Sequence, residues 1–138
     1  MTSTLVSVLR SVGAVFAGFA VITLGTVVTF TVLVEDFGYH TSSPIELLIG
    51  TIGALASGVA GGLLTARLAA SHPVRHAAAL VVPIALDTAS IIASAGPGSD
   101  PLWFDVGGSA ILLLGALVGG LLIATRGRPS AVRVSHPA

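Results

Sequence analysis

Four long apolar stretches, at about 11–34, 45–66, 77–96 and 104–125, constrain the fold of this chain more than any other feature. Each has about the 20 residues that a helix needs to cross the hydrocarbon core of a bilayer. Only helices and closed barrels satisfy their backbone polar groups in lipid, and these stretches are too long and continuous for barrel strands. The sequence therefore predicts an all-α fold, a transmembrane bundle of four helices in up-and-down order.

The composition supports a membrane protein and excludes several other classes. Hydrophobic residues make up 54% of the 138 residues and charged residues only 9%, against about 25% charged residues in a soluble domain. Cysteine is absent, which excludes disulfides, thiol catalysis and cysteine-bound metal. Six arginines spread along the chain form no basic surface that would hold nucleic acid. The abundance of Ala, Val, Gly and Leu and the absence of lysine suggest a GC-rich bacterial genome.

The charges are sorted between alternate connections. The arginines flank one set of helix ends, and most of the acids lie in or beside the other two connections: Arg10, Arg67, Arg75, Arg126, Arg128 and Arg133 against Glu35, Asp36, Glu46, Asp100 and Asp105. Because cytoplasmic loops retain Lys and Arg, we expect both termini in the cytoplasm. Residues 1–126 would form the transmembrane domain and 127–138 a short cytoplasmic tail. The uncharged stretch 11–34 is too long for a cleaved signal and favours a retained anchor.

Local signals mark the starts of the later helices. Ser43, Pro44 and Glu46 have the spacing of a capping box with a proline in the first turn. Asp100 followed by Pro101 predicts a similar cap before the fourth helix, and His72 followed by Pro73 does so less well before the third. Acids at these positions also suit the positive end of a helix, without any catalytic role.

Small residues recur along the second and fourth helices at the spacing of one helix face. Candidate helix-packing residues are Gly50, Ala54, Gly58 and Gly62 in the second helix and Gly115 and Gly119 in the fourth. Gly53, Ser57 and Gly61 form an adjacent ridge. Such faces let helices approach closely, because packing rather than the hydrophobic effect drives association in lipid. The pattern does not distinguish packing within one chain from packing between subunits.

Asp87 is the one ionisable residue that lies away from the ends of the apolar stretches, and such residues normally face a bundle interior or a wet cavity. Ser90 and Ser94 share its helix face, and Pro83 is expected to bend the helix. Thr23, Thr26 and Thr29 offer a polar stripe on the first helix. One hypothesis is a proton- or cation-responsive site. The other is a buried acid that fixes helix packing through hydrogen bonds.

The remaining chemistry-bearing residues favour anchoring over catalysis. His72 and His76 are four residues apart, but no third ligand is near in sequence, so no metal site is expected. Trp103, Phe104 and Tyr39 have the positions of interfacial aromatic anchors. No nucleotide-binding loop, nucleophile elbow or carboxylate pair is present. We therefore expect no enzyme and no cofactor.

Several segments resemble a broad group of small bacterial four-span membrane proteins. They are 53–55, 61–69, His76-Ala77, the Pro-Leu-Trp-Phe entry at 101–104, and Gly119-Gly120. The resemblance covers about residues 5–125 and implies the topology and a bacterial plasma membrane, but no activity. Asp87 is not part of the shared pattern. The glutamate of the small multidrug exporters is missing from the first span, and the signatures of fluoride channels are missing altogether.

The sequence thus predicts a multi-pass protein of the bacterial cell membrane. Its expected role is that of a structural or interaction component that packs through small-residue helix faces. Its expected partners are the lipid bilayer and either further copies of itself or another membrane protein, with no nucleic acid. The alternative is a small proton- or cation-linked transporter or channel centred on Asp87.

Overall fold

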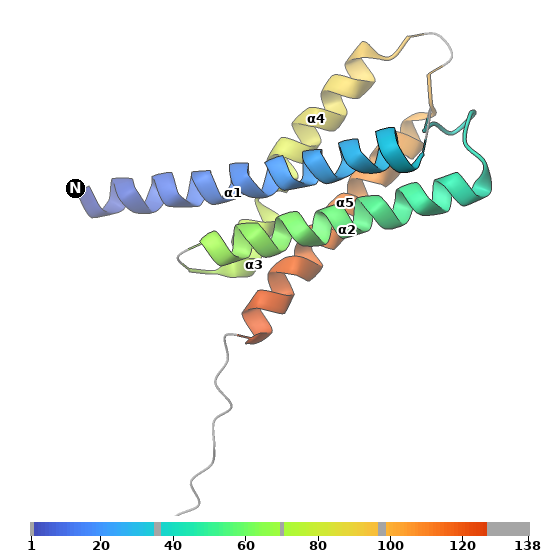
Figure 1. Ribbon diagram of the computed structural model, residues 1–138. Coiled ribbons are helices and arrows are strands. Elements are labelled where there is room, and N and C mark those ends of the chain that lie inside the picture. Colours follow the sequence, from blue (N-terminus) through green and yellow to red (C-terminus); the bar gives the residue numbers. More distant parts are fainter. Residues whose placement is uncertain (1, 35–36, 70, 97–98, 127–138) are drawn as a thin grey trace, which may run out of the picture.

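The computed structural model describes residues 2–34, 37–69, 71–96 and 99–126, and within these ranges all regular structure is helical (Figure 1). Four helical spans are long and apolar enough to cross a membrane: Thr4–Leu33, Pro44–Leu68, Pro73–Ser94 and Leu102–Arg126. The prediction of an all-α fold with four membrane-spanning helices is confirmed. The chain is accordingly a multi-pass membrane protein.

The first span is longer than its apolar stretch. Helix α1 covers Thr2–Val28 and continues through a π-helical segment, η1, over Thr29–Leu33. The helix begins at Thr2, well before residue 11, and it therefore includes Arg10. The Nε of Arg10 donates to the Leu68 carbonyl at 2.9 Å. An arginine bound to the carbonyl end of a neighbouring helix suits the edge of the bilayer, where long side chains reach out of the hydrocarbon.

The start of α2, Pro44–Leu68, is a complete capping box, as the sequence predicted. Ser43 Oγ accepts from the Glu46 amide at 3.4 Å, and the Glu46 carboxylate accepts from the Ser43 amide at 2.6 Å. The connection before α5, Leu102–Arg126, differs from expectation. There the Asp100 carboxylate accepts from the Tyr39 amide at 2.8 Å, so it joins the two connections at this end of the bundle.

The third span is divided into α3, Pro73–Ala78, and α4, Val81–Ser94. The break lies four residues before Pro83, whose ring excludes the Ala79 carbonyl from its usual helical bond. That carbonyl accepts instead from the Val82 amide at 3.2 Å, which closes a tighter turn. The expected bend is therefore present as a full interruption. His72 precedes α3 with φ 49° and makes no side-chain cap.

The largest helix contact joins α2 to α5 and depends on glycine. A Cβ at Gly58 would overlap the Leu112 carbonyl, and one at Gly62 would overlap Ala116. From the other side, Gly115 and Gly119 lie against the backbone of α2 at Leu55 and Val59. Ala54 is 5% exposed, whereas Gly50 lies under the Phe37 ring. All six candidate packing residues are therefore buried within one chain, and four of them form the direct contact between α2 and α5.

The adjacent ridge of α2 lies against α1. Gly53 is covered by Thr29, Ser57 lies at Gly25, and Gly61 lies at Gly18 and Ile22. In Figure 1, α1 and α2 run side by side and α5 crosses them. The central apolar core, where α1, α4 and α5 meet, consists of Ile22, Leu80, Ile84 and Ala116. Both small-residue faces of α2 are therefore occupied by helices of the same chain.

Helix α4 is the least packed of the spans. It contacts α5 but makes almost no contact with α1, and its far end leans away from the other helices (Figure 1). Leu86 and Ile91 remain 67% and 50% exposed. An open space therefore separates α1 from α4, and its lining is the candidate functional site.

Candidate functional site: a polar groove between α1, α4 and α5

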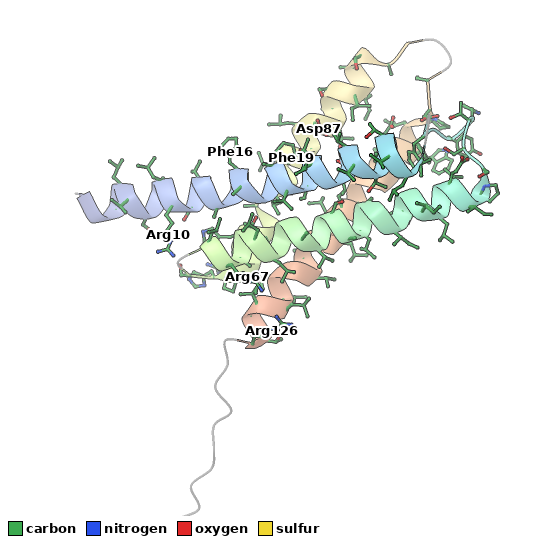
Figure 2. The ribbon with its side chains drawn as sticks, in the orientation of Figure 1. Arg10, Phe16, Phe19, Arg67, Asp87 and Arg126 are labelled. Carbon is green, nitrogen blue, oxygen red and sulfur yellow. The ribbon has the colours of Figure 1, made fainter. Side chains whose placement is uncertain are left out.

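A groove of about 470 Å³ lies between α1, α4 and the first half of α5. Asp87 lines it from α4, and Figure 2 shows this residue where α4 passes α1, near Phe19. The other residues of the lining are Phe19, Ile22, Thr23, Thr26, Val27, Phe30, Thr31, Phe37, Ala54, Ile84, Thr88, Ile91, Asp100, Phe104, Asp105, Gly108, Ser109 and Leu112. The groove therefore combines carboxylates and hydroxyls with apolar and aromatic walls.

Asp87 is exposed to this groove rather than buried, and no described residue donates a hydrogen bond to its carboxylate. Ser90 and Ser94 do not line the groove. Their hydroxyls donate to the carbonyls of Asp87 and Ile91 in their own helix. The hypothesis of a buried acid held by hydrogen bonds within the chain does not match this environment.

The polar stripe expected on α1 is divided between two faces. Thr23 and Thr26 line the groove opposite Asp87. Thr29 is 5% exposed and lies over Gly53 of α2, with its hydroxyl donated to the Gly25 carbonyl at 2.8 Å. The following segment η1 adds Phe30 and Thr31 to the groove. Departures from α-helical geometry of this kind are frequent at functional sites.

Several hydroxyls of the groove use their protons within the chain and present oxygen atoms to the open space. Thr26 donates to the carbonyls of Ile22 and Thr23, and Thr31 donates to that of Val27. On the opposite wall, Ser109 donates to the Asp105 carbonyl at 3.0 Å. A hydroxyl that gives its proton to the backbone keeps lone pairs for a ligand.

One pair of hydroxyls connects the α4 wall of the groove to its α5 wall. Thr88 of α4 and Ser109 of α5 are joined Oγ to Oγ, and Thr88 also donates to the Ile84 carbonyl at 2.8 Å. Neither residue stood out in the sequence. Their only signal is position, since Thr88 follows Asp87 and Ser109 lies one turn after Asp105. The pairing depends on the crossing of two helices, which no local pattern encodes.

The groove is acidic, and the described arginines lie at the other end of the bundle. Asp87, Asp100 and Asp105 all line it. Figure 2 shows Arg10, Arg67 and Arg126 toward the start of α1 and the ends of α2 and α5. We name this side the arginine end, with Arg75 of α3. Glu35, Asp36, Arg128 and Arg133, and the expected tail 127–138, lie outside the described residues.

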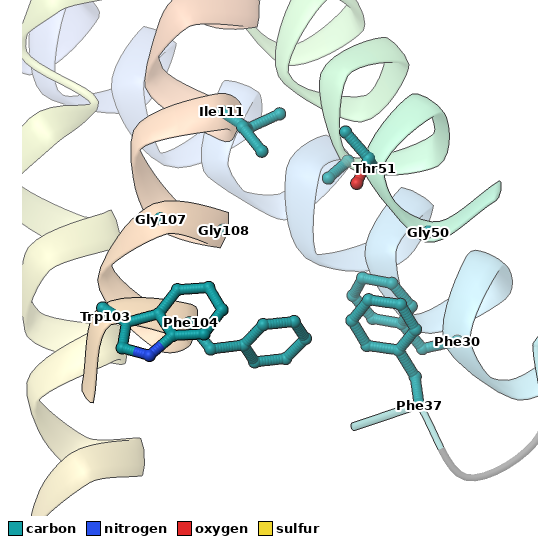
Figure 3. A pocket seen from close by; sticks show the side chains of 10 residues that line it. Phe30, Phe37, Gly50, Thr51, Trp103, Phe104, Gly107, Gly108 and Ile111 are labelled. Carbon is teal, nitrogen blue, oxygen red and sulfur yellow. The ribbon is translucent and has the colours of Figure 1, made fainter. Parts of the chain in front are cut away.

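A second, almost wholly apolar pocket of about 230 Å³ adjoins the groove between α2 and α5 (Figure 3). Phe30 stacks on Phe37 with ring centroids 4.4 Å apart, and Phe37 reaches Phe104 at 5.6 Å. Trp103 meets Tyr39 edge-to-face at 4.9 Å. Phe30, Phe37 and Phe104 line both spaces. We call this side of the bundle the aromatic end.

The histidine pair lies where α3 meets α1. His76 Nε2 is 3.0 Å from Ser11 Oγ, and its Nδ1 is 3.2 Å from the His72 carbonyl oxygen, so the ring connects α3 to α1. Among the described residues, no group of three or more His, Cys, Asp or Glu side chains is placed to hold a metal ion.

Comparison of the chain with protein-family models, with curated proteins and with solved structures gave no match. The resemblance to small bacterial four-span proteins therefore stays a prediction.

Proposed function

We propose that the protein is a non-enzymatic interaction component of a bacterial plasma membrane, and that it assembles with another membrane-embedded chain through the groove between α1 and α4. The main support is that some helix faces are covered by other helices of the chain and others are open. The small-residue faces of α2 are already covered by α1 and α5. The α1–α4 side is open and carries Asp87. Assembly is thus expected at the groove rather than at the glycine faces.

The cost of placing an unpaired acid in the hydrocarbon core favours this assignment. An acid near the middle of a span costs about 2.5–3.5 kcal/mol on insertion scales unless it is paired or hydrated. Asp87 lies seven residues before the end of α4 at Ser94, about 10 Å along a helix, and receives no hydrogen bond from a described residue. A partner that supplies a donor would lower this cost and would also cover the exposed Leu86 and Ile91.

Site-specific photo-crosslinking in native membranes tests the proposal. The reporter is placed at Val27 or Ile91 in the groove, or at Leu114 on α5 as a control, since Leu114 is 58% exposed and lines neither space. We expect one protein adduct of defined mass at both groove positions and none at Leu114. Asp87→Leu should remove the adduct. Crosslinks to lipid alone at Val27 and Ile91 would refute assembly through the groove.

A second candidate is a small proton- or cation-linked transporter or channel centred on Asp87. It is favoured by the three carboxylates of one groove, two of them near the aromatic end. Purified protein in liposomes tests it by pH-dependent uptake of protons or monovalent cations. Asp87→Asn should abolish the flux, whereas Ser90→Ala, outside the groove, should not. A flux no greater than that of protein-free liposomes removes this candidate.

A further inference from the structure

The lining of the groove also specifies what kind of chain fits it. We infer that the occupant is a transmembrane helix of a different protein that carries a lysine or arginine at the depth of Asp87. This inference rests on the proposed function and names the partner class for the same surface. Three observations support it: the hydrogen-bonding groups that line the groove, the positions of the arginines in this chain, and the apolar rims of the groove on α1 and α4.

The groove offers more acceptors than donors. Asp87 and Asp105 contribute carboxyl groups, which act only as hydrogen-bond acceptors in their ionised form. The protons of Thr26 and Thr31 are held by backbone carbonyls. Thr88 and Ser109 share their protons between each other and the carbonyls of their own helices. The complementary group is one that only donates and carries positive charge, which describes the side chains of Lys and Arg. Ionisable groups inside membranes are normally paired in this way.

A second copy of this chain does not supply that group. The sequence contains no lysine. Arg10 precedes Thr23, a groove residue opposite Asp87, by 13 positions on α1, which is about 20 Å along a helix. The other described arginines lie at the same arginine end. Copies inserted with the same orientation would place all these cations far from Asp87.

The open side has the form of a helix-binding surface. Its rims on α1 and α4 carry large apolar side chains, with Val27 51% and Ile91 50% exposed. Both helices line the groove that holds the Asp87 carboxylate, and few of their residues approach each other. A partner helix would cover both rims, and the aliphatic part of its basic side chain would lie along Phe19 and Val27 while its charge reached Asp87.

Synthetic peptides in lipid vesicles test the inference. The purified full chain, labelled by a single introduced cysteine at Ser99, is reconstituted with a Leu-Ala transmembrane peptide that carries either Lys or Leu at the depth of Asp87. Energy transfer measures their association. We expect the Lys peptide to bind at least about tenfold more tightly than the Leu peptide. Asp87→Asn should remove this difference, whereas Glu46→Gln, an acid outside the groove, should preserve it.

The other outcomes overturn the inference in distinguishable ways. Equal, groove-dependent binding of both peptides would refute the basic partner and leave the proposed assembly intact. No binding of either peptide, together with lipid-only crosslinks at Val27 and Ile91, would refute both. Self-association of the chain that Asp87→Asn abolishes, without Lys-peptide binding, would assign the groove to a second copy.

Discussion

Thr88 on α4 and Ser109 on α5 share a hydrogen bond, and this bond is the polar connection that holds the least packed helix to the bundle. Both hydroxyls line the groove. Polar contacts between membrane helices contribute about 0.6 kcal/mol on average and at most about 1.7 kcal/mol. A bond of that size tethers α4 but leaves it able to adjust to an occupant.

Ser109→Ala should destabilise the folded protein by about 0.6–1.7 kcal/mol and widen the distribution of α4–α5 distances. The change removes one partner of an interhelical bond in a region where α4 has few other contacts. Denaturant titration in mixed micelles and spin-label distances measure the two effects. Thr125→Ala is the control, because its hydroxyl serves only its own helix. Equal stability of the two variants would contradict the tethering role.

Gly62→Ala should destabilise the protein by about 1–3 kcal/mol, because the added Cβ meets the backbone of Ala116, which cannot move aside. Gly13→Ala is a matched control, since a Cβ there meets nothing within 4 Å. The helix propensity of alanine makes that control neutral or stabilising by up to about 1 kcal/mol. Thermal unfolding in detergent measures both. A neutral Gly62→Ala would show that α2 and α5 are not packed this closely.

Pro83→Ala should join α3 and α4 into one helix. The new amide at position 83 becomes a donor for the Ala79 carbonyl, which now accepts from Val82. Hydrogen exchange of the amides at 79–84 should therefore slow. Exchange in a proteolytic peptide that covers α2 serves as the internal reference and should not change. Unchanged exchange would mean that the packing of α3 against α2 and α5, and not the proline, sets the break.

The orientation in the membrane has its own test. Because the chain lacks cysteine, single cysteines can replace Ser71, between α2 and α3, and Ser99, between α4 and α5, both exposed. With the arginine end in the cytoplasm, an impermeant maleimide added to whole cells should label the Ser99→Cys variant. It should label Ser71→Cys only after permeabilisation. The opposite pattern would reverse the expected topology.

The sequence predicted those features that depend on neighbours within one helix. The capping box at Ser43 and Glu46 and the interruption before Pro83 each need only a few adjacent residues. The small-residue faces were visible as well, because a face repeats at helical spacing. Gly50 is the exception, since a loop side chain, Phe37, covers it.

The lining of the groove required the tertiary structure. Ser90 and Ser94 share a helix face with Asp87, yet serine in a helix readily donates to its own backbone, as both do here. The residues that meet Asp87 across the groove come from α1 and α5. Their contribution depends on the angles at which the helices cross, which no local sequence pattern encodes.

The aromatic end has a practical consequence for spectroscopy. Trp103 is the single tryptophan of the sequence, and it lies at the entry of α5 against Tyr39 and beside the wall that the pocket and groove share. The tryptophan fluorescence of the whole protein therefore comes from one known position. Its emission maximum and quenching provide a label-free gauge of how deeply that end sits in lipid and of any rearrangement when the groove is filled.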